Sequence, residues 1–197
     1  SREHTVDRPA AGFVSIAGGK YTTYRVMGKD VVDRAVIELR KLTQESVTEK
    51  LPLVGADGYF ALEQQKERIA QESGLDVETV THLLNRHGSL ISEILEIIEE
   101  QPKLAAKLDA NLPYIKAEIV YATSHEGARS VDDVISRRTR LSFEAVNHGV
   151  HLADDVAALI APVLGWSAKE RKDSVAQYIE LVEREIVALD ELLEVNS

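Results

Sequence analysis

Hydrophobic positions recur at helical spacing from about residue 59 to the end of the chain. Two stretches show the pattern best. In the first the apolar positions are Leu90, Ile91, Ile94, Leu95, Ile97 and Ile98, and in the second they are Val175, Ile179, Val182, Ile186, Leu189 and Leu193. Side chains three and four residues apart share one helix face, so each stretch predicts a helix with one buried side. We therefore predict an all-α bundle of six or seven helices over residues 59–197.

The first forty residues follow a different pattern. Ser1 to Ala11 is polar and predicts an extended segment, and the apolar run Phe13 to Ala17 predicts a short buried strand. Gly18 and Gly19 then predict a turn. A helix capped by Thr22 or Thr23 is expected to follow as far as Lys41. Its apolar stripe consists of Met27, Val31, Ala35, Val36, Leu39 and Leu42.

Turn-forming residues divide the chain. The segment Thr43–Gly58 contains Pro52, Gly55 and Gly58 and predicts a linker. We place the domain boundary there, giving a strand–turn–helix unit over 1–50 and an all-helical domain over 51–197.

Several helix limits are also predicted. Helices are expected over Tyr59–Ser73, over Val77 to about His87, from Ser89 to Pro102, and from Pro113 through Val120. Asp76 is the expected cap of the second of these. A further helix is expected over Phe143–Leu164. Two capping boxes, Ser130 with Asp133 and Ser167 with Glu170, are expected to begin the helices that follow them.

The composition narrows the possible functions. The chain of 197 residues carries a net charge of −10 and has no cysteine, which excludes disulfides, thiolate zinc sites and cysteine nucleophiles. An acidic chain repels nucleic acids and anionic lipids on average. No apolar run approaches the ~18 residues of a membrane-spanning helix, and no signal peptide is present in the residues shown.

The glycine corner at the end of the first strand is the main candidate site. Gly18 and Gly19 allow a close backbone approach, the first N–H groups of a helix point at the turn, and Lys20 adds a positive charge. This combination suits an anion or an electron-rich carbonyl edge of a bound ring. The alternative from the residues alone is an ordinary strand-to-helix turn with a solvated lysine.

Three motifs carry a family resemblance. The run from Gly18 to Met27 resembles the GGK-x-TTYR-x-M segment of FAD-dependent glycerol-3-phosphate dehydrogenases. Ser1 to His4 is similar to the SR-[DE]-[HY] segment upstream of it, and Asp133 to Leu141 is similar to the D-x-L-x-RRTRL signature of the C-terminal helical domain in that family. The three matches occur in the family's order and cover most of the chain. The chain therefore resembles the C-terminal part of such an enzyme, beginning near the end of its FAD domain.

The resemblance implies a function for the full-length protein. It would oxidise sn-glycerol 3-phosphate to dihydroxyacetone phosphate with FAD as cofactor, and would pass electrons to quinone, or to oxygen in an oxidase relative. We expect a cytoplasmic protein, with the full-length form peripheral on the inner face of the membrane as the family implies, and leave a homodimer open. The chain has no G-x-G-x-x-G after a strand, so FAD is not expected to bind the fragment, which should be inactive without the missing FAD and substrate domains.

The resemblance also assigns residues. Arg2 and Lys20 would bind the anionic substrate, and the cofactor-binding set would be Gly18, Gly19, Lys20, Tyr21, Thr22 and Thr23. The alternative for Arg2 is a frayed terminal residue. No general base is identifiable, and we interpret His4 as structural or exposed.

Two polar clusters in the helical domain favour structural interpretations. Arg137, Arg138 and Arg140 could hold an anion, but ion pairs with Asp132, Asp133 or Glu126 are the preferred interpretation. The series His148, His151 and Asp155 would share a helix face, which we interpret as an exposed polar face rather than a metal site; no metal is expected.

Two rival functions remain. Residues Lys66 to Gly88 match the apolar and glycine spacing of a helix-turn-helix, but the second helix offers only Arg86 as a firm positive charge, so DNA binding is not expected. The other rival is a stand-alone helical interaction module, in which the enzyme-like first residues would be incidental.

Overall fold

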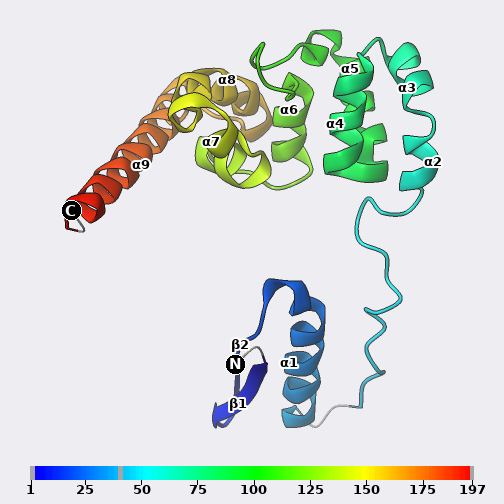
Figure 1. Ribbon diagram of the computed structural model, residues 1–197, viewed down its shortest axis with the longest axis vertical. Coiled ribbons are helices and arrows are strands. Elements are labelled where there is room, and N and C mark those ends of the chain that lie inside the picture. Colours follow the sequence, from blue (N-terminus) through cyan, green and yellow to red (C-terminus); the bar gives the residue numbers. More distant parts are fainter. Residues whose placement is uncertain (1–2, 40–41, 196–197) are drawn as a thin grey trace. The chain divides into compact units, whose positions relative to one another are not determined.

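The computed structural model describes residues 3–39 and 42–195, with side chains described as far as residue 188. It consists of two compact units, Ser1–Leu53 and Val54–Ser197 (Figure 1). The described residues form nine α-helices and one two-stranded sheet, so the predicted mostly helical fold with a short β-containing start is confirmed.

The first unit is a β-hairpin beside a helix. Strands β1 (His4–Ala10) and β2 (Phe13–Gly18) pair antiparallel, with Val6 opposite Ile16. The polar segment at the start of the chain is thus the partner strand of the predicted one. A 3₁₀ turn, Tyr21–Thr23, leads into α1 (Tyr24–Glu38). The expected extension of this helix to Lys41 lies partly outside the described residues, which stop at 39 and resume at 42.

This first unit has no hydrophobic core of its own. Among its described residues none is fully buried, and four of the predicted apolar positions of α1 are only half-buried. Leu39 and Leu42 are exposed, and so are Phe13, Val32 and Ile37. An ordinary small unit buries such side chains, so this unit presents an unusually large exposed apolar surface.

The second unit is a row of helices. Its elements begin with α2 (Tyr59–Glu63), α3 (Lys66–Ser73), α4 (Val77–His87), a 3₁₀ turn (Gly88–Leu90), α5 (Ile91–Glu100) and a 3₁₀ turn (Pro102–Ala105). They continue with α6 (Lys116–Ser124), a π-helix (Asp133–Arg138), α7 (Leu141–Glu144), a 3₁₀ stretch (Val146–Leu152), α8 (Ala153–Leu164) and α9 (Ala168–Val195). In Figure 1, α2 to α5 lie at one end of this unit and α7 to α9 at the other, with α6 between them.

Helix α6 separates two hydrophobic cores. Ala117 and Tyr121 belong to the core formed with α3, α4 and α5, whereas Ile119 and Ala122 belong to the core formed with α8 and α9. A helix that is apolar on both sides is expected to be buried on both sides. The predicted single bundle is therefore two cores joined through one central helix.

The helix count in this unit differs from the prediction. The structure has eight α-helices over its described residues instead of six or seven. The expected helix over 59–73 is divided into two short helices, α2 and α3, with Gln64 and Gln65 between them. The helix predicted from Pro113 begins only at Lys116, and that predicted from Ser89 begins with a 3₁₀ turn.

The expected continuous helix over Phe143–Leu164 is wrong. Asn147, His148 and Gly149 all have positive φ, of 49°, 53° and 72°, which interrupts the right-handed helix. Left-handed backbone costs a non-glycine residue about 1–2 kcal/mol. The Tyr178 hydroxyl donates a hydrogen bond to the His148 carbonyl oxygen and Gly149 is buried, so tertiary packing holds this turn.

The capping predictions are mostly confirmed. Asp76 accepts a hydrogen bond from the Thr79 N–H at 2.6 Å. Ser167 and Glu170 form the reciprocal pair, at 2.7 and 3.2 Å. In the third case the Asp133 N–H donates to Ser130 as expected, but the Asp133 carboxylate accepts from the Arg129 N–H instead of the Ser130 N–H.

Replacing Asp76 with alanine is expected to lower the free energy of unfolding by about 1 kcal/mol, since an orphan N–H of α4 loses its acceptor. The hydrogen bond from Thr79 holds the pKa of Asp76 below its ordinary value against the opposing effect of burial. Urea unfolding of Asp76→Ala and Asp76→Asn at neutral pH would measure this, with the asparagine variant retaining most of the stability. Equal loss in both variants would show that the negative charge matters and the cap does not.

Candidate functional site

The glycine corner lies at the end of β2. Gly18 and Gly19 have φ of +80° and +81°, a region that side-chain-bearing residues rarely adopt. A Cβ on Gly18 would lie 2.9 Å from the Glu3 carbonyl oxygen, and one on Gly19 would lie 2.7 Å from the Met27 sulfur. The positive φ therefore favours glycine at both positions, and at Gly18 the close approach of the Glu3 backbone also leaves no room for a side chain.

Hydrogen bonds of Thr23 hold the turn after the glycines. Its hydroxyl donates to the Lys20 carbonyl oxygen at 2.9 Å, and its N–H donates to the same oxygen at 3.0 Å. Thr23 occupies the cap position of α1, as one of the two predicted alternatives, but its side chain does not cap that helix. The N–H groups of Tyr21 and Thr22 precede the first helical hydrogen bond, so they belong to the donors that a helix leaves for an outside acceptor.

The corner is open on its own unit. Lys20 is exposed, Tyr21 is 90% exposed and Tyr24 is 52% exposed. The two tyrosine rings stack with centroids 5.9 Å apart. A lysine and a pair of stacked aromatic rings on an exposed turn have the chemistry to contact an anion and a planar ring together.

His4 contacts the glycine corner and links it to α1. Its Nε2 lies 2.8 Å from Asp30 Oδ2, which links β1 to α1. His4 pairs with Gly18 in the sheet, and its Cβ lies 3.3 Å from the position that a Cβ on Gly19 would occupy. These contacts are what the structural interpretation of His4 predicts. Arg2, the other predicted substrate residue, lies outside the described residues.

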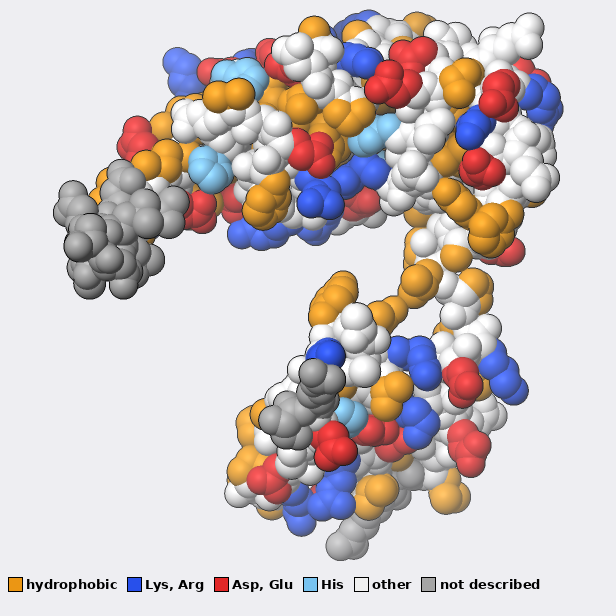
Figure 2. Space-filling model, viewed as in Figure 1, with side chains coloured by type: hydrophobic (Ala, Val, Ile, Leu, Met, Phe, Trp, Pro, Cys, Tyr) orange, Lys and Arg blue, Asp and Glu red, His pale blue; other side chains and the backbone are white. Residues whose placement is uncertain are grey.

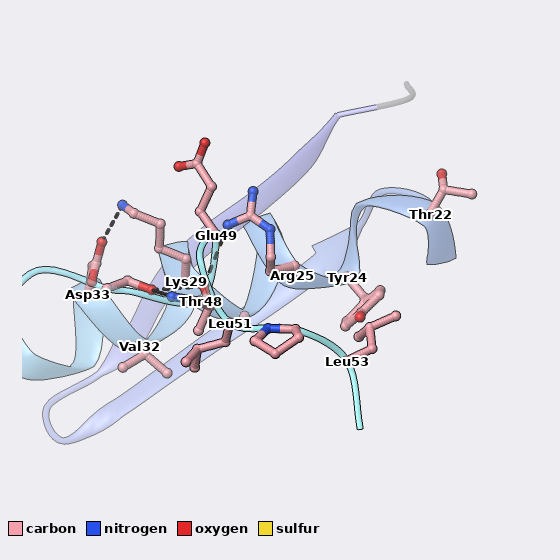
Figure 3. Close-up of a pocket in the computed structure, with 13 residues that line it drawn as sticks. Thr22, Tyr24, Arg25, Lys29, Val32, Asp33, Thr48, Glu49, Leu51 and Leu53 are labelled. Atoms are coloured by element: carbon pink, nitrogen blue, oxygen red, sulfur yellow. Dashed lines mark hydrogen bonds and ion pairs between the residues drawn. The ribbon is translucent and has the colours of Figure 1, made fainter. Parts of the chain in front are cut away.

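A cavity of about 690 Å³ lies beside α1, on the side where the segment from Ser46 to Leu53 follows it (Figure 3). Tyr24, Val32 and Leu53 give it a largely apolar wall, and Arg25 donates to the Thr48 hydroxyl at 3.5 Å across it. This part of the expected linker thus lies against the helix. The sequence contained the apolar residues that line it, but no periodicity that would pair them with α1.

The arginine cluster forms internal contacts, as predicted. Arg137 bonds to Asp132 and lies 3.2 Å from Asp133. Arg138 donates through Nε to the Glu126 carbonyl oxygen at 2.9 Å, and Arg140 lies 3.6 Å from Glu144. The partner of Arg138 is thus a backbone oxygen and not the expected carboxylate.

The histidine series does not share a helix face. His148 lies in the left-handed turn, and His151 Nε2 lies 3.3 Å from Asp109 Oδ2. Among the side chains that the structure describes, in residues 3–39 and 42–188, no group of histidine, aspartate and glutamate could hold a metal ion. In the same part of the chain, every helix is too short or too polar to cross a membrane.

Comparison with known families decides the classification. Residues 46–171 match the model of the C-terminal domain of alpha-glycerophosphate oxidase. The chain belongs to this family. The motif over Asp133–Leu141 lies inside the matched range, whereas the glycine corner lies before it.

Individual relatives extend the match over nearly the whole chain. Glycerol-3-phosphate dehydrogenase 2 of Mycobacterium bovis is 47% identical over 188 residues, which are 95% of this chain and 32% of the relative. The mitochondrial glycerol-3-phosphate dehydrogenase of Mus musculus is 32% identical over 179 residues, 89% of this chain and 24% of its own length. The chain thus spans about a third or less of these relatives.

A solved structure shares the fold. It is the glycerol-3-phosphate dehydrogenase of Bacillus halodurans complexed with FAD, with a TM-score of 0.68 and 23% identity. The likeness covers 86% of this chain and 35% of that one. This likeness shows a shared fold over most of the chain.

The glycine corner fits one edge of a flavin but not the whole cofactor. The open turn has N–H donors, Lys20 and two aromatic rings, which suit the polar edge of a planar ring. The described residues contain no glycine-rich turn between a parallel strand and a helix, the element that holds the phosphates of a dinucleotide. Residues for the rest of FAD would have to come from other polypeptide.

Proposed function

We propose that this chain is the C-terminal third of a flavoprotein that oxidises sn-glycerol 3-phosphate to dihydroxyacetone phosphate and passes the electrons to quinone. The observation that carries the proposal is the open Gly18–Lys20 corner on a unit without a core of its own. The family membership and the length of the relatives support it, since two thirds of such a protein would lie outside this chain.

In this proposal Lys20 and Arg2 bind the phosphate of the substrate. The phosphate carries about two negative charges near neutral pH, which matches a lysine point charge and an arginine fork. Lys20 extends from an exposed turn whose backbone is fixed by Thr23, so its amine can reach a ligand lying against the corner. The two residues would orient C2 of the substrate toward the flavin.

The corner backbone has a second role in the proposal. FAD, when bound, would supply the acceptor for the hydride from C2 of the substrate. The N–H groups of Tyr21 and Thr22 would donate to the polar edge of the ring, where negative charge increases during the reaction. Gly18 and Gly19 would allow this approach because neither carries a side chain. The exposed apolar side chains of the first unit would pack against the rest of the flavin domain.

The isolated chain is expected to be colourless and to oxidise no glycerol 3-phosphate, because it lacks a cradle for the ADP half of FAD. The test mixes the purified chain with excess FAD, removes free cofactor by gel filtration, and records absorbance near the flavin band together with dye-coupled activity. The full-length protein from the same source, treated identically, is the control. A yellow and active fragment would contradict the proposal, and a full-length protein without FAD would favour the interaction-module alternative.

A further inference from the structure

A second cavity lies within the helical unit, away from the glycine corner in the sequence. It measures about 460 Å³ and is lined by side chains of α4, of the segment before α6, and of α7 with the residue preceding it. The principal polar side chains are His82, Asn85, Arg86, Arg140 and Glu144. Figure 2 shows histidine and Lys or Arg side chains gathered on one face of this unit, in the region where α4 and α6 lie in Figure 1.

Arg86 makes hydrogen bonds within the protein through only some of its guanidinium N–H groups. Its Nη2 donates to the Arg138 carbonyl oxygen at 2.6 Å, and its guanidinium lies over the Tyr114 ring at 5.4 Å. Its buried Nε lies 3.9 Å from Glu118 but has no hydrogen-bond partner among the described residues. A guanidinium has five N–H donors, and buried ones are normally paired. The Nε itself is buried, but the Arg86 side chain is 24% exposed and lines the cavity, so the remainder of its guanidinium is the part that a ligand there could contact.

Asn85 and Arg140 add further donors. The Asn85 Oδ1 accepts a hydrogen bond from the Tyr59 hydroxyl at 3.0 Å, and the exposed Asn85 side chain lines the cavity with an NH₂ group that can donate two hydrogen bonds. Arg140 is 69% exposed, and its Nε is 3.6 Å from Glu144, a distance typical of a weak surface pair. The wall therefore carries more donors than acceptors.

Both carboxylates near the cavity are already engaged. Glu118 is 2% exposed and accepts hydrogen bonds from His82, His87 and the Ile115 N–H, so it faces away from solvent. Glu144 accepts a hydrogen bond from the Tyr114 hydroxyl at 3.1 Å and leaves only a partly exposed oxygen for Arg140. Glu118 approaches Arg86 only to 3.9 Å and Glu144 approaches Arg140 only to 3.6 Å, so neither carboxylate makes a close hydrogen bond to these arginines.

From these contacts we infer that the cavity binds a small oxyanion, a phosphate group or a carboxylate, held by Arg86, Arg140 and the Asn85 amide. The ligand would displace Glu144 from Arg140 and accept the free guanidinium and amide hydrogens. All residues of this site belong to the helical unit, and the inference does not rest on the proposed flavin contact.

The test titrates the 197-residue chain with sodium phosphate and, separately, with sodium acetate, while sodium chloride keeps the ionic strength constant. Amide NMR shifts or calorimetry would report binding. We expect saturable binding of at least one of the two anions, and which one binds more tightly separates phosphate from carboxylate chemistry. Arg140→Gln and Asn85→Asp are each expected to weaken binding by about tenfold, equivalent to about 1.4 kcal/mol.

The matched control is Arg137→Gln. It removes the same charge from an exposed arginine three residues away, whose partners are Asp132 and Asp133 and not the cavity. Binding should be unchanged in this variant, and all three variants should keep the wild-type circular dichroism spectrum. Equal weakening by Arg137→Gln and Arg140→Gln, or no saturable binding of either anion to the wild type, would overturn the inference.

Discussion

Lys20→Ala in the full-length protein is expected to lower kcat/KM for glycerol 3-phosphate by about 100-fold, the effect typical of losing one charged donor in a closed active site. The physical reason is that Lys20 directly follows the two glycines on a turn held by the Thr23 hydroxyl, so its charge belongs to the corner itself. Steady-state kinetics with a dye acceptor would measure the change, and bound FAD and the melting temperature should stay close to wild type.

The matched control for Lys20 is Lys29→Ala. Lys29 is a partly exposed lysine of α1 in the same unit, and it lies 2.7 Å from Asp33. Removing it changes the charge equally but should leave kcat/KM within about twofold, as expected for an exposed pair. Lys20→Arg should recover part of the activity because it restores the charge. Wild-type kinetics in Lys20→Ala would remove its proposed role and leave the ordinary solvated lysine as the interpretation.

Glu118→Gln is expected to lower the free energy of unfolding by about 3 kcal/mol, because it leaves a buried ionic cluster without its negative charge. The carboxylate is 2% exposed and lies 2.9 Å from His82 and 3.3 Å from His87. For a chain of this length the loss corresponds to a fall of about 6–12 °C in the melting temperature. Calorimetry at pH 7 would measure it, with the exposed Glu99→Gln on α5 as the control that should change little.

The pH dependence of the difference in unfolding free energy between the wild type and Glu118→Gln is a second measurement of the role of Glu118. Burial alone raises the pKa of this carboxyl, but hydrogen bonds from His82 and His87 outweigh it and hold the pKa below its ordinary value. A lowered pKa stabilises the fold above the ordinary pKa of about 4.3, and the contribution is lost as the pH falls toward the folded value. The gap between wild type and Glu118→Gln should therefore narrow below about pH 4.3. A gap independent of pH would mean that the charge is not the cause.

The contacts of Glu118 form a buried polar cluster that sequence reasoning missed. His82 and His87 lie on α4, and Glu118 lies on α6, 36 and 31 residues further along the sequence. No local spacing connects them, and Glu118 occurs within a mostly apolar helix start where it resembles a first-turn glutamate. Only the packing of α4 against α6 brings the three side chains together, so no pattern in the sequence could have indicated this cluster.

The interruption of the predicted helix at Asn147 to Gly149 also results from contacts between residues far apart in the sequence. The apolar positions on either side continue at helical spacing, and Asn and His tolerate helices, so local pattern favoured one helix. In the structure the Tyr178 hydroxyl of α9 holds the left-handed turn from a position 30 residues away. Tertiary contacts outweighed local propensity there, and they moved His148 and His151 off the face that their spacing predicted.

The sequence by itself determined the family, the mostly helical fold, the caps at Asp76 and Ser167, and the glycine corner, because each depends on residues adjacent in the chain or one helical turn apart. Tertiary structure alone decided the pairing of the first polar segment with β2, the two cores on either side of α6, and the cavity around Arg86. These features join residues far apart in sequence, and their free energy comes from burial and pairing that exist only once the chain has folded.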